Sequence, residues 1–258
     1  MTKIVWDKDG ERTYESGTDR GVFYIRNTEE QELTDHYKYG VGEAWNGITA
    51  FTSSPSGAEV TKLWADNRVY ASMTSAEEYG ATIEAYTYPD SFANCDGSRV
   101  ISGGIFVGQQ NRKKFAFAVR TMKGNDTEGY DHGYILHLIW NCTAGTTERS
   151  YATQNDSPEA ITFSWEINTE PVTVNSKDED GNEMKPTAHI EIDTTMLNAA
   201  GKDTLQNLED MLYGTASTEP RFPDDPDYVI NLFRNGGGES GGESGAPESG
   251  SEEENGVG

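Results

Sequence analysis

The amino-acid sequence predicts a mainly β protein, an antiparallel β-sandwich or barrel-like fold with one flanking α-helix at about 203–213. Apolar and polar residues alternate with a period of two along much of the chain, which is typical of strands that bury one face and expose the other. Only one segment shows a clear helical period. The alternating strand–helix order that predicts a parallel sheet does not occur.

The strand candidates follow one another with turn-like segments between them. In 160–168, for example, Phe163, Trp165 and Ile167 alternate with polar residues. Most candidates are therefore expected to have one buried (dry) face and one solvent-exposed (wet) face, as in antiparallel sheets packed face to face. The long candidates are YGATIEAYT at 79–87, KKFAFAVRTM at 113–122, GYILHLIW at 133–140, AITFSWEIN at 160–168 and TAHIEID at 187–193, and the shorter ones lie at 21–26, 44–52 and 60–72.

The predicted helix is followed by a segment with regularly spaced prolines. Asp203 is expected to cap the helix and Gly214 to end it, with a leucine-rich stripe on the buried face. Prolines between 220 and 226 then keep the chain extended, so that the apolar segment 229–233 docks. We expect these parts to brace the end of the domain against its own sheet or a neighbouring subunit. The residues of this C-terminal brace are Leu208, Leu212, Tyr213, Phe222, Leu232 and Phe233.

Composition divides the chain into one domain at 1–234 and a Gly/Ser/Glu-rich acidic tail at 235–258. The tail cannot bury apolar surface and is expected to be disordered. The formal net charge of −24 predicts repulsion from nucleic acids and anionic membranes, which argues against a DNA-gripping role and is compatible with an acidic wall past which DNA slides. We expect no secretory signal and no membrane-spanning helix, because no long apolar segment occurs. Cys95 and Cys142 are expected to be reduced thiols.

The sequence predicts no catalytic, cofactor-binding or metal-binding residues, because no established motif is complete. No pair of histidines has the spacing of metal ligands. The segment 176–181 resembles half of a calcium loop, but Thr187 stands where a glutamate is required, which favours a plain turn. Glu191 and Asp193 share a strand face, as the carboxylates of some sandwich-fold glycosidases do, yet the second glutamate of that pattern is missing.

Several long blocks resemble the major tail proteins (tail tube proteins) of long-tailed bacteriophages with a non-contractile tail. The resemblance covers about residues 3–233 and excludes the acidic tail. The segment PRFPDDPDYV at 220–229 is more acidic than the proline segment of that family. The blocks include WDKDGERTYESGTDRGVFYI at 6–25, SAEEYGATIEAYTYPDSFANCDGS at 75–98, VGQQNRKKFAFAVRT at 107–121, GNDTEGYDHGYILHLIWN at 124–141, and LEDMLYGT at 208–215 with VINLF at 229–233.

The resemblance implies a structural virion protein without enzymatic activity. In that family a β-sandwich with a flanking helix assembles into hexameric rings, and the inner sheets of the subunits join into a continuous β-barrel around a lumen. The implied partners are other copies of the chain, a tape-measure protein and a tail terminator, with DNA passing through without specific binding. The implied location is the virion tail, after assembly in the cytoplasm of the bacterial host, with no membrane partner and no cofactor.

The polar and aromatic segment 27–45 is the candidate for contacts between subunits or between stacked rings. The residues selected there are Asp35, Tyr37, Tyr39 and Trp45. The alternative interpretation is a lectin-like carbohydrate-binding β-sandwich, in which exposed aromatic rings stack on sugars. Its support is a set of tyrosines expected at the surface: Tyr37, Tyr39, Tyr86 and Tyr88.

Overall fold

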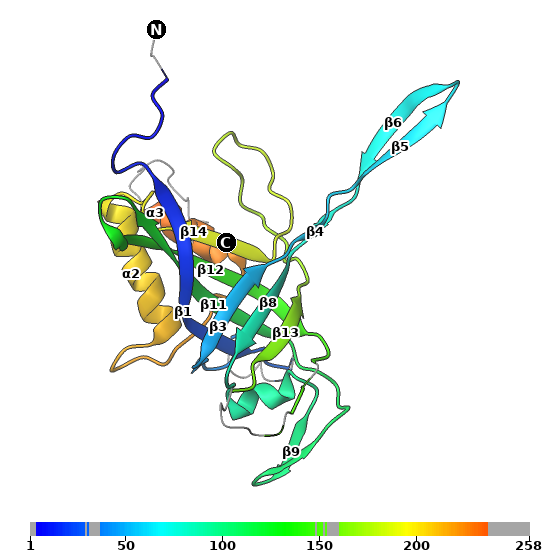
Figure 1. Cartoon of the computed structure of the whole chain (residues 1–258), viewed down its shortest axis with the longest axis vertical. Coiled ribbons are helices and arrows are strands. Elements are labelled where there is room, and N and C mark those ends of the chain that lie inside the picture. The colour runs from blue at the N-terminus through cyan, green and yellow to red at the C-terminus, as the bar shows by residue number, and fades with distance from the viewer. Residues whose placement is uncertain are drawn as a thin grey trace, which may run out of the picture.

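The computed structural model of the chain describes residues 4–28, 30, 37–147, 149–151, 153 and 160–236. An eight-stranded antiparallel sheet carries the fold, with the strand order β2–β1–β11–β12–β13–β8–β3 and with β14 paired to β12 (Figure 1). Its strands are β1 (Thr13–Ile25), β2 (Glu43–Ala44), β3 (Ile48–Ser53), β8 (Gly80–Ala85), β11 (Phe115–Asn125), β12 (Gly129–Ala144), β13 (Phe163–Asn168) and β14 (His189–Asp193). The predicted fold class, mainly β with antiparallel sheets, is confirmed.

Shorter elements extend from this sheet or cover it. Three two-stranded ladders lie outside it, together with one 3-10 helix and two α-helices among the described residues. These elements are β4 (Ser56–Gly57), β5 (Val60–Ala65), β6 (Arg68–Thr74), β7 (Glu77–Glu78), η1 (Asp90–Asn94), β9 (Arg99–Ser102), β10 (Ile105–Val107), α2 (Ala199–Tyr213) and α3 (Pro226–Gly236). None of the described helices is both long enough and apolar enough to cross a membrane.

The long strand β12 belongs to both layers of the sandwich. It pairs with β11 and β14 along most of its length and then with β13 at Thr143 and Ala144. Between these two regions Asn141 has a φ of 51°, in the left-handed region that asparagine tolerates better than most residues. The register with β11 also shifts near this point. The chain therefore bends at Asn141 and brings the β13–β8–β3 strands over the β14–β12–β11–β1 strands.

The β11 and β12 strands are buried on both faces, not on one face as the alternation predicted. Residues 115–120 and 135–140 are all buried. One hydrophobic cluster lies between the two strand layers and contains Phe117, Ile139 and Trp165. A second lies between β11, β12 and the C-terminal helices and contains Leu138 and Leu208. The prediction of a wet face is wrong for these strands because the helices cover it.

The C-terminal region contains more helix than the sequence predicted. The helix α2 begins at Ala199 and not near Asp203, because the Asn198 side chain caps it and accepts a 2.7 Å hydrogen bond from the Gly201 amide. It ends at Tyr213, and Gly214 has a φ of 75°, as the predicted stop requires. The apolar residues after the prolines form the second helix, α3, with Pro226 in its first turn.

Replacing Leu208 with alanine is expected to destabilise the protein by about 2–5 kcal/mol, because the fully buried side chain lies between α2 and the sheet. Urea unfolding followed by circular dichroism would measure the change in the free energy of unfolding. Asn207→Ala, at an exposed position on the same helix, is the control and should change it by less than about 0.5 kcal/mol. Equal effects of the two substitutions would contradict the packing of α2 described above.

Candidate assembly surfaces

A two-stranded arm projects from the body of the protein (Figure 1). It begins where β3 ends, runs through β4 and β5, turns at Asp66 and Asn67, and returns through β6 and β7 into β8. Asp66 and Asn67 both have a positive φ, of 51° and 61°, which is the backbone geometry of a tight type I′ hairpin turn. The arm is thus a continuation of the paired strands β3 and β8.

Both faces of the arm carry exposed apolar side chains. Trp64 is 68% exposed and lies opposite Val69 on one face, while Leu63 and Met73 are exposed on the other. Tyr70, 74% exposed, is the extra residue where the register shifts. A two-stranded hairpin in water is at best marginally stable by itself, and a contiguous exposed apolar surface is typical of an interaction site. The arm therefore has the composition of a segment that is covered by a partner.

A second apolar hairpin, formed by β9 and β10, lies at the opposite end of the long axis of the molecule (Figure 1). The Arg99 guanidinium ties its base to the body, donating hydrogen bonds to the carbonyl oxygens of Asn94 (3.0 Å) and Asn111 (2.7 Å). Its exposed side chains are Val100, Ile101, Ile105, Phe106 and Val107. The protein thus exposes apolar hairpins at both ends.

The β13–β8–β3 layer has one dry and one wet face, as the sequence predicted for such strands. Trp165, Ile167 and Ile83 point into the core. On the other face Glu166 lies opposite Thr82, and Ser164 lies opposite Glu84, in two neighbouring cross-strand rows. This wet face is polar and acidic, and the helices lie on the far side of the other layer.

Two of the longer strands form open sheet edges within the described part of the chain. The strand β3 pairs with β8 alone, and β14 pairs with β12 alone. Open edges present unpaired backbone groups to which another strand can be added. The open edges of β3 and β14 are therefore available for strand pairing between copies of the chain.

The structure places the predicted subunit-contact residues in different environments, and Asp35 lies outside the described residues. Tyr37 is exposed, with the Arg221 guanidinium 4.6 Å from its ring centroid. Tyr39 is buried and donates a 3.2 Å hydrogen bond to Asn141 Oδ1, which fixes it at the bend of β12. Trp45 is buried in the core, 4.4 Å from Phe92 between ring centroids. The contact role of all of them remains a prediction, and Tyr39 and Trp45 have a structural role within the monomer.

The C-terminal brace lies against the sheet of its own chain. Leu208, Leu212 and Phe222 are buried in the second hydrophobic cluster, and Tyr213, Leu232 and Phe233 pack against it. Hydrogen bonds reinforce these contacts: the Tyr24 hydroxyl donates to the Leu212 carbonyl (2.6 Å), and Trp140 Nε1 donates to the Pro223 carbonyl (3.0 Å). Tyr213 and Trp45 also line one cavity of about 540 Å³ beside β1.

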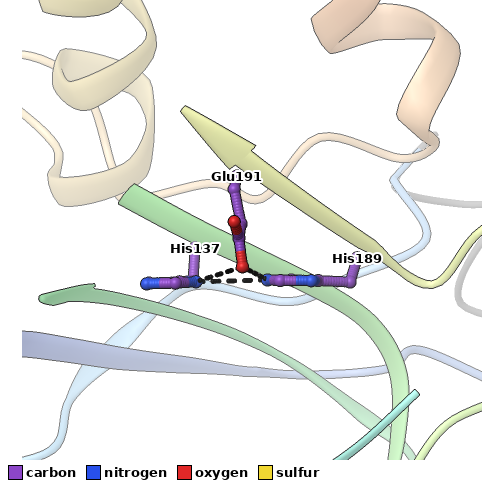
Figure 2. A group of neighbouring side chains, drawn as sticks. All are labelled: His137, His189 and Glu191. Atoms are coloured by element: carbon purple, nitrogen blue, oxygen red, sulfur yellow. Dashed lines mark hydrogen bonds and ion pairs between the residues drawn. The ribbon is translucent and has the colours of Figure 1, made fainter. Parts of the chain in front are cut away.

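Three potential metal ligands meet between β12 and β14, a grouping that spacing along the sequence did not predict. His137 and His189 are 52 residues apart, but their rings are parallel to within 3°, and Glu191 lies beside both (Figure 2). Burial lowers the pKa of His137 to about 4 and that of His189 to about 3. Both rings are therefore neutral near pH 7. The sequence pattern that could have indicated this grouping is His189-x-Glu191, which puts two ligand types on one face of a strand.

The structure gives different partners to the two carboxylates considered for glycoside hydrolysis. Glu191 lies beside the neutral ring of His137. Asp193 forms an ion pair with Lys123. In the calcium-loop-like segment, Asp178 accepts hydrogen bonds from the backbone and side-chain nitrogens of Asn182, as in the predicted plain turn.

The tyrosines that favoured a sugar-binding surface are not all exposed. Tyr37 and Tyr86 are exposed. Tyr39 is buried, and Tyr88 packs against the core beside Phe163 and Trp165. The expectation of an exposed ring is therefore wrong for Tyr39, and Tyr88 is half-buried.

No protein-family model and no curated sequence matches the chain. Several solved structures are similar in part, among them two tube assemblies. The SPP1 tail tube, determined by solid-state NMR and cryo-EM, superposes with a TM-score of 0.34 and 9% identity, covering 70% of this chain and 86% of that one. The sheath–tube complex of PVC, an extracellular contractile injection system, in its extended state superposes with a TM-score of 0.28 and 10% identity, covering 68% and 89%.

Asp227 in the first turn of α3 offers a pH-dependent test of the brace. Its carboxylate accepts hydrogen bonds from the backbone amides of Ser176 and Asn175, both at 2.8 Å. The Ser176 side chain, together with these amides, lowers the pKa of Asp227 to about 2. Asp227→Asn is expected to lower the free energy of unfolding at pH 7 by about 1 kcal/mol, because it weakens the hydrogen bonds to this carboxylate. The loss is no larger because solvent screens the site. Since the folded-state pKa lies below the unfolded value of about 3.9, this stabilisation is present above pH 4 and lost as the pH falls toward 2.

Urea unfolding of both proteins between pH 7 and pH 3 would measure this difference. The difference in the free energy of unfolding between wild type and variant should become smaller below pH 4. Asp203→Asn, at an exposed carboxylate of α2, is the matched control and should show no such difference. A difference that persists unchanged to pH 3 would mean that the Asp227 charge does not hold α3 against residues 175–176.

Proposed function

We propose that this protein is the subunit of a phage tail tube, a structural protein that polymerises into a hollow tube. The observation that carries the proposal is the presence of apolar hairpins at opposite ends of the molecule. A surface at one end that fits a different surface at the other end generates a heterologous contact, and repetition of that contact builds rings or open polymers. The sequence blocks that resemble tail tube proteins support the same conclusion.

In this proposal the partner of the β5–β6 arm is a second copy of the chain. The arm carries apolar side chains on both faces, so a neighbour must cover more than one side of it. The β9–β10 hairpin and the open edges of β3 and β14 are the surfaces available for such contacts. Rings of six subunits, stacked on a tape-measure protein and closed by a tail terminator, are the assembly that the family resemblance implies.

The wet face of the β13–β8–β3 layer lines the lumen in this proposal. It is polar, carries Glu84 and Glu166, and lies on the side of the molecule away from the helices. An acidic wall repels the phosphate backbone, so the genome can slide past without specific binding. The tube would thereby form part of the virion tail and deliver the genome, with no catalytic step in the subunit.

The arm is tested by the double substitution Trp64→Ser and Tyr70→Ser. We expect no tubes or rings by negative-stain electron microscopy, under conditions in which the wild-type protein forms them, because the apolar contact between copies is lost. The free energy of unfolding of the monomer should change by less than about 0.5 kcal/mol per site, since both side chains are exposed. Lys62→Ser and Thr74→Ser, at polar positions of the same arm, form the control and should leave assembly intact. Normal tubes from the first variant would exclude the arm as an assembly contact.

The luminal face is tested by thiol labelling of the Glu166→Cys variant. The native Cys95 and Cys142 are free and buried, and burial raises the pKa of Cys95 to about 12, so the background is low. In assembled tubes the introduced thiol should react with a small maleimide but not with one attached to a large polymer, because a water-filled lumen admits only the small reagent. Unassembled protein is the control and should react with both. Reaction with the large reagent in tubes would place this face outside, and protection from both reagents would place it in a subunit contact.

A further inference from the structure

The cluster of His137, His189 and Glu191 is built by strand pairing and not by a loop. In the β12–β14 ladder His137 lies opposite Glu191, and Ile139 lies opposite His189. Alternate residues of a strand share a face, so all three side chains point to the same side of the sheet. Figure 2 shows the two imidazole rings facing each other edge to edge, with the Glu191 carboxylate completing a triangle. The backbone of two paired strands therefore fixes the positions of the three groups.

The spacing of the three ligand atoms is that of a tetrahedral metal site. His137 Nδ1 is 3.2 Å from His189 Nε2 and 3.5 Å from Glu191 Oε1, and His189 Nε2 is 3.8 Å from Glu191 Oε1. Ligand atoms about 2.0–2.1 Å from a tetrahedral Zn²⁺ lie roughly 3.3–3.4 Å apart. An ion placed between the three atoms would thus be within bonding distance of all of them after small side-chain adjustments.

Neighbouring groups hold the two rings in the orientation that ligation requires. Thr121 Oγ1 is 2.9 Å from His137 Nε2, which leaves Nδ1 of that ring directed at the cluster. The ring of Tyr79 stacks on His189 with centroids 4.0 Å apart, and Phe51 lies 5.5 Å from His137. Groups that bind the second nitrogen of a histidine and fix its ring are a regular feature of metal sites.

The charge and access of the cluster also suit a cation. Glu191 forms no ion pair with a lysine or arginine within the described part of the chain, and the nearby Glu15 adds further negative potential. The Glu191 side chain is 54% exposed, and His189 lines an open pocket of about 1070 Å³ at the base of the arm. An ion can therefore reach the site from solvent, and a fourth position remains open to water.

We propose that His137, His189 and Glu191 bind one divalent transition-metal ion of the zinc class, with water as the fourth ligand. Two nitrogen ligands and one carboxylate suit Zn²⁺ or Co²⁺, whereas Ca²⁺ and Mg²⁺ require mainly oxygen ligands. The ion links the edge strand β14 to β12. Because Tyr79 stacks on His189, the ion also restrains the base of the arm. This site is independent of the proposed tube function, because it lies within one subunit.

The test uses the full chain, stripped with EDTA and transferred to metal-free buffer, with Co²⁺ and Zn²⁺ as the probes. One equivalent of Co²⁺ should produce the visible absorption bands of tetrahedral cobalt, and Zn²⁺ should displace it. Isothermal titration should give a stoichiometry of one. A hundredfold excess of Zn²⁺ over its Kd should raise Tm by about 5 °C or more.

Variants assign the site. Glu191→Gln and His189→Gln should each weaken Co²⁺ binding by at least about tenfold and remove the tetrahedral bands. The control is His132→Gln, which alters a histidine of the same strand that contacts Glu128 and lies outside the cluster. This control variant should leave the Co²⁺ affinity and the tetrahedral bands unchanged. Glu191 is half-exposed, so its variant should fold normally, which circular dichroism would verify.

The proposal is overturned if the wild-type chain binds no stoichiometric Co²⁺. It is also overturned if both cluster variants bind as well as the wild type, or if His132→Gln abolishes binding. Several weak equivalents without tetrahedral bands would show that the metal binds only to the acidic surface, which equally contradicts the proposed site.

Discussion

The structure depends on the burial of both faces of β12. One face, with Leu136, Leu138 and Trp140, packs under the C-terminal helices, and the other contributes Ile139 to the core between the strand layers. The bend at Asn141 then carries the same strand into its pairing with β13. The two layers and the helices are consequently coupled through one strand, so β12 contributes to the stability of all three parts.

The period-two pattern predicted the strands and the antiparallel class well, because alternation records which face of a strand is buried. It could not show what covers the other face. Ala116 and Ala118 in β11 were a usable signal, since small apolar residues on the supposed wet face allow a helix to approach closely. The helix α3 was missed because the three prolines dominated the local pattern, although the third of them starts the helix.

The candidate sites were less accessible to sequence reasoning, because they depend on what the fold brings together. Tyr39 and Trp45 lie in segments with loop-like composition, yet their rings are buried by contacts with Phe222 and Phe92. His137 and His189 meet only through the register of two strands, which local spacing does not encode. The segment 60–72 was predicted as one strand, but the structure turns the chain at Asp66 and Asn67 and forms the two strands β5 and β6. The exposed apolar faces of this arm became apparent only from its projection away from the body.

The origin of the arm has a mechanical consequence. Its two strands continue directly into β3 and β8, which pair with each other, and β8 also pairs with β13. A tensile load applied at the tip would pull β3 and β8 in the same direction and would stress the hydrogen bonds between β8 and β13 in shear, many at a time. Rupture by shear requires the bonds to fail together, whereas peeling breaks them one after another. The arm is therefore anchored as a strut that resists pulling and not as a flexible tether.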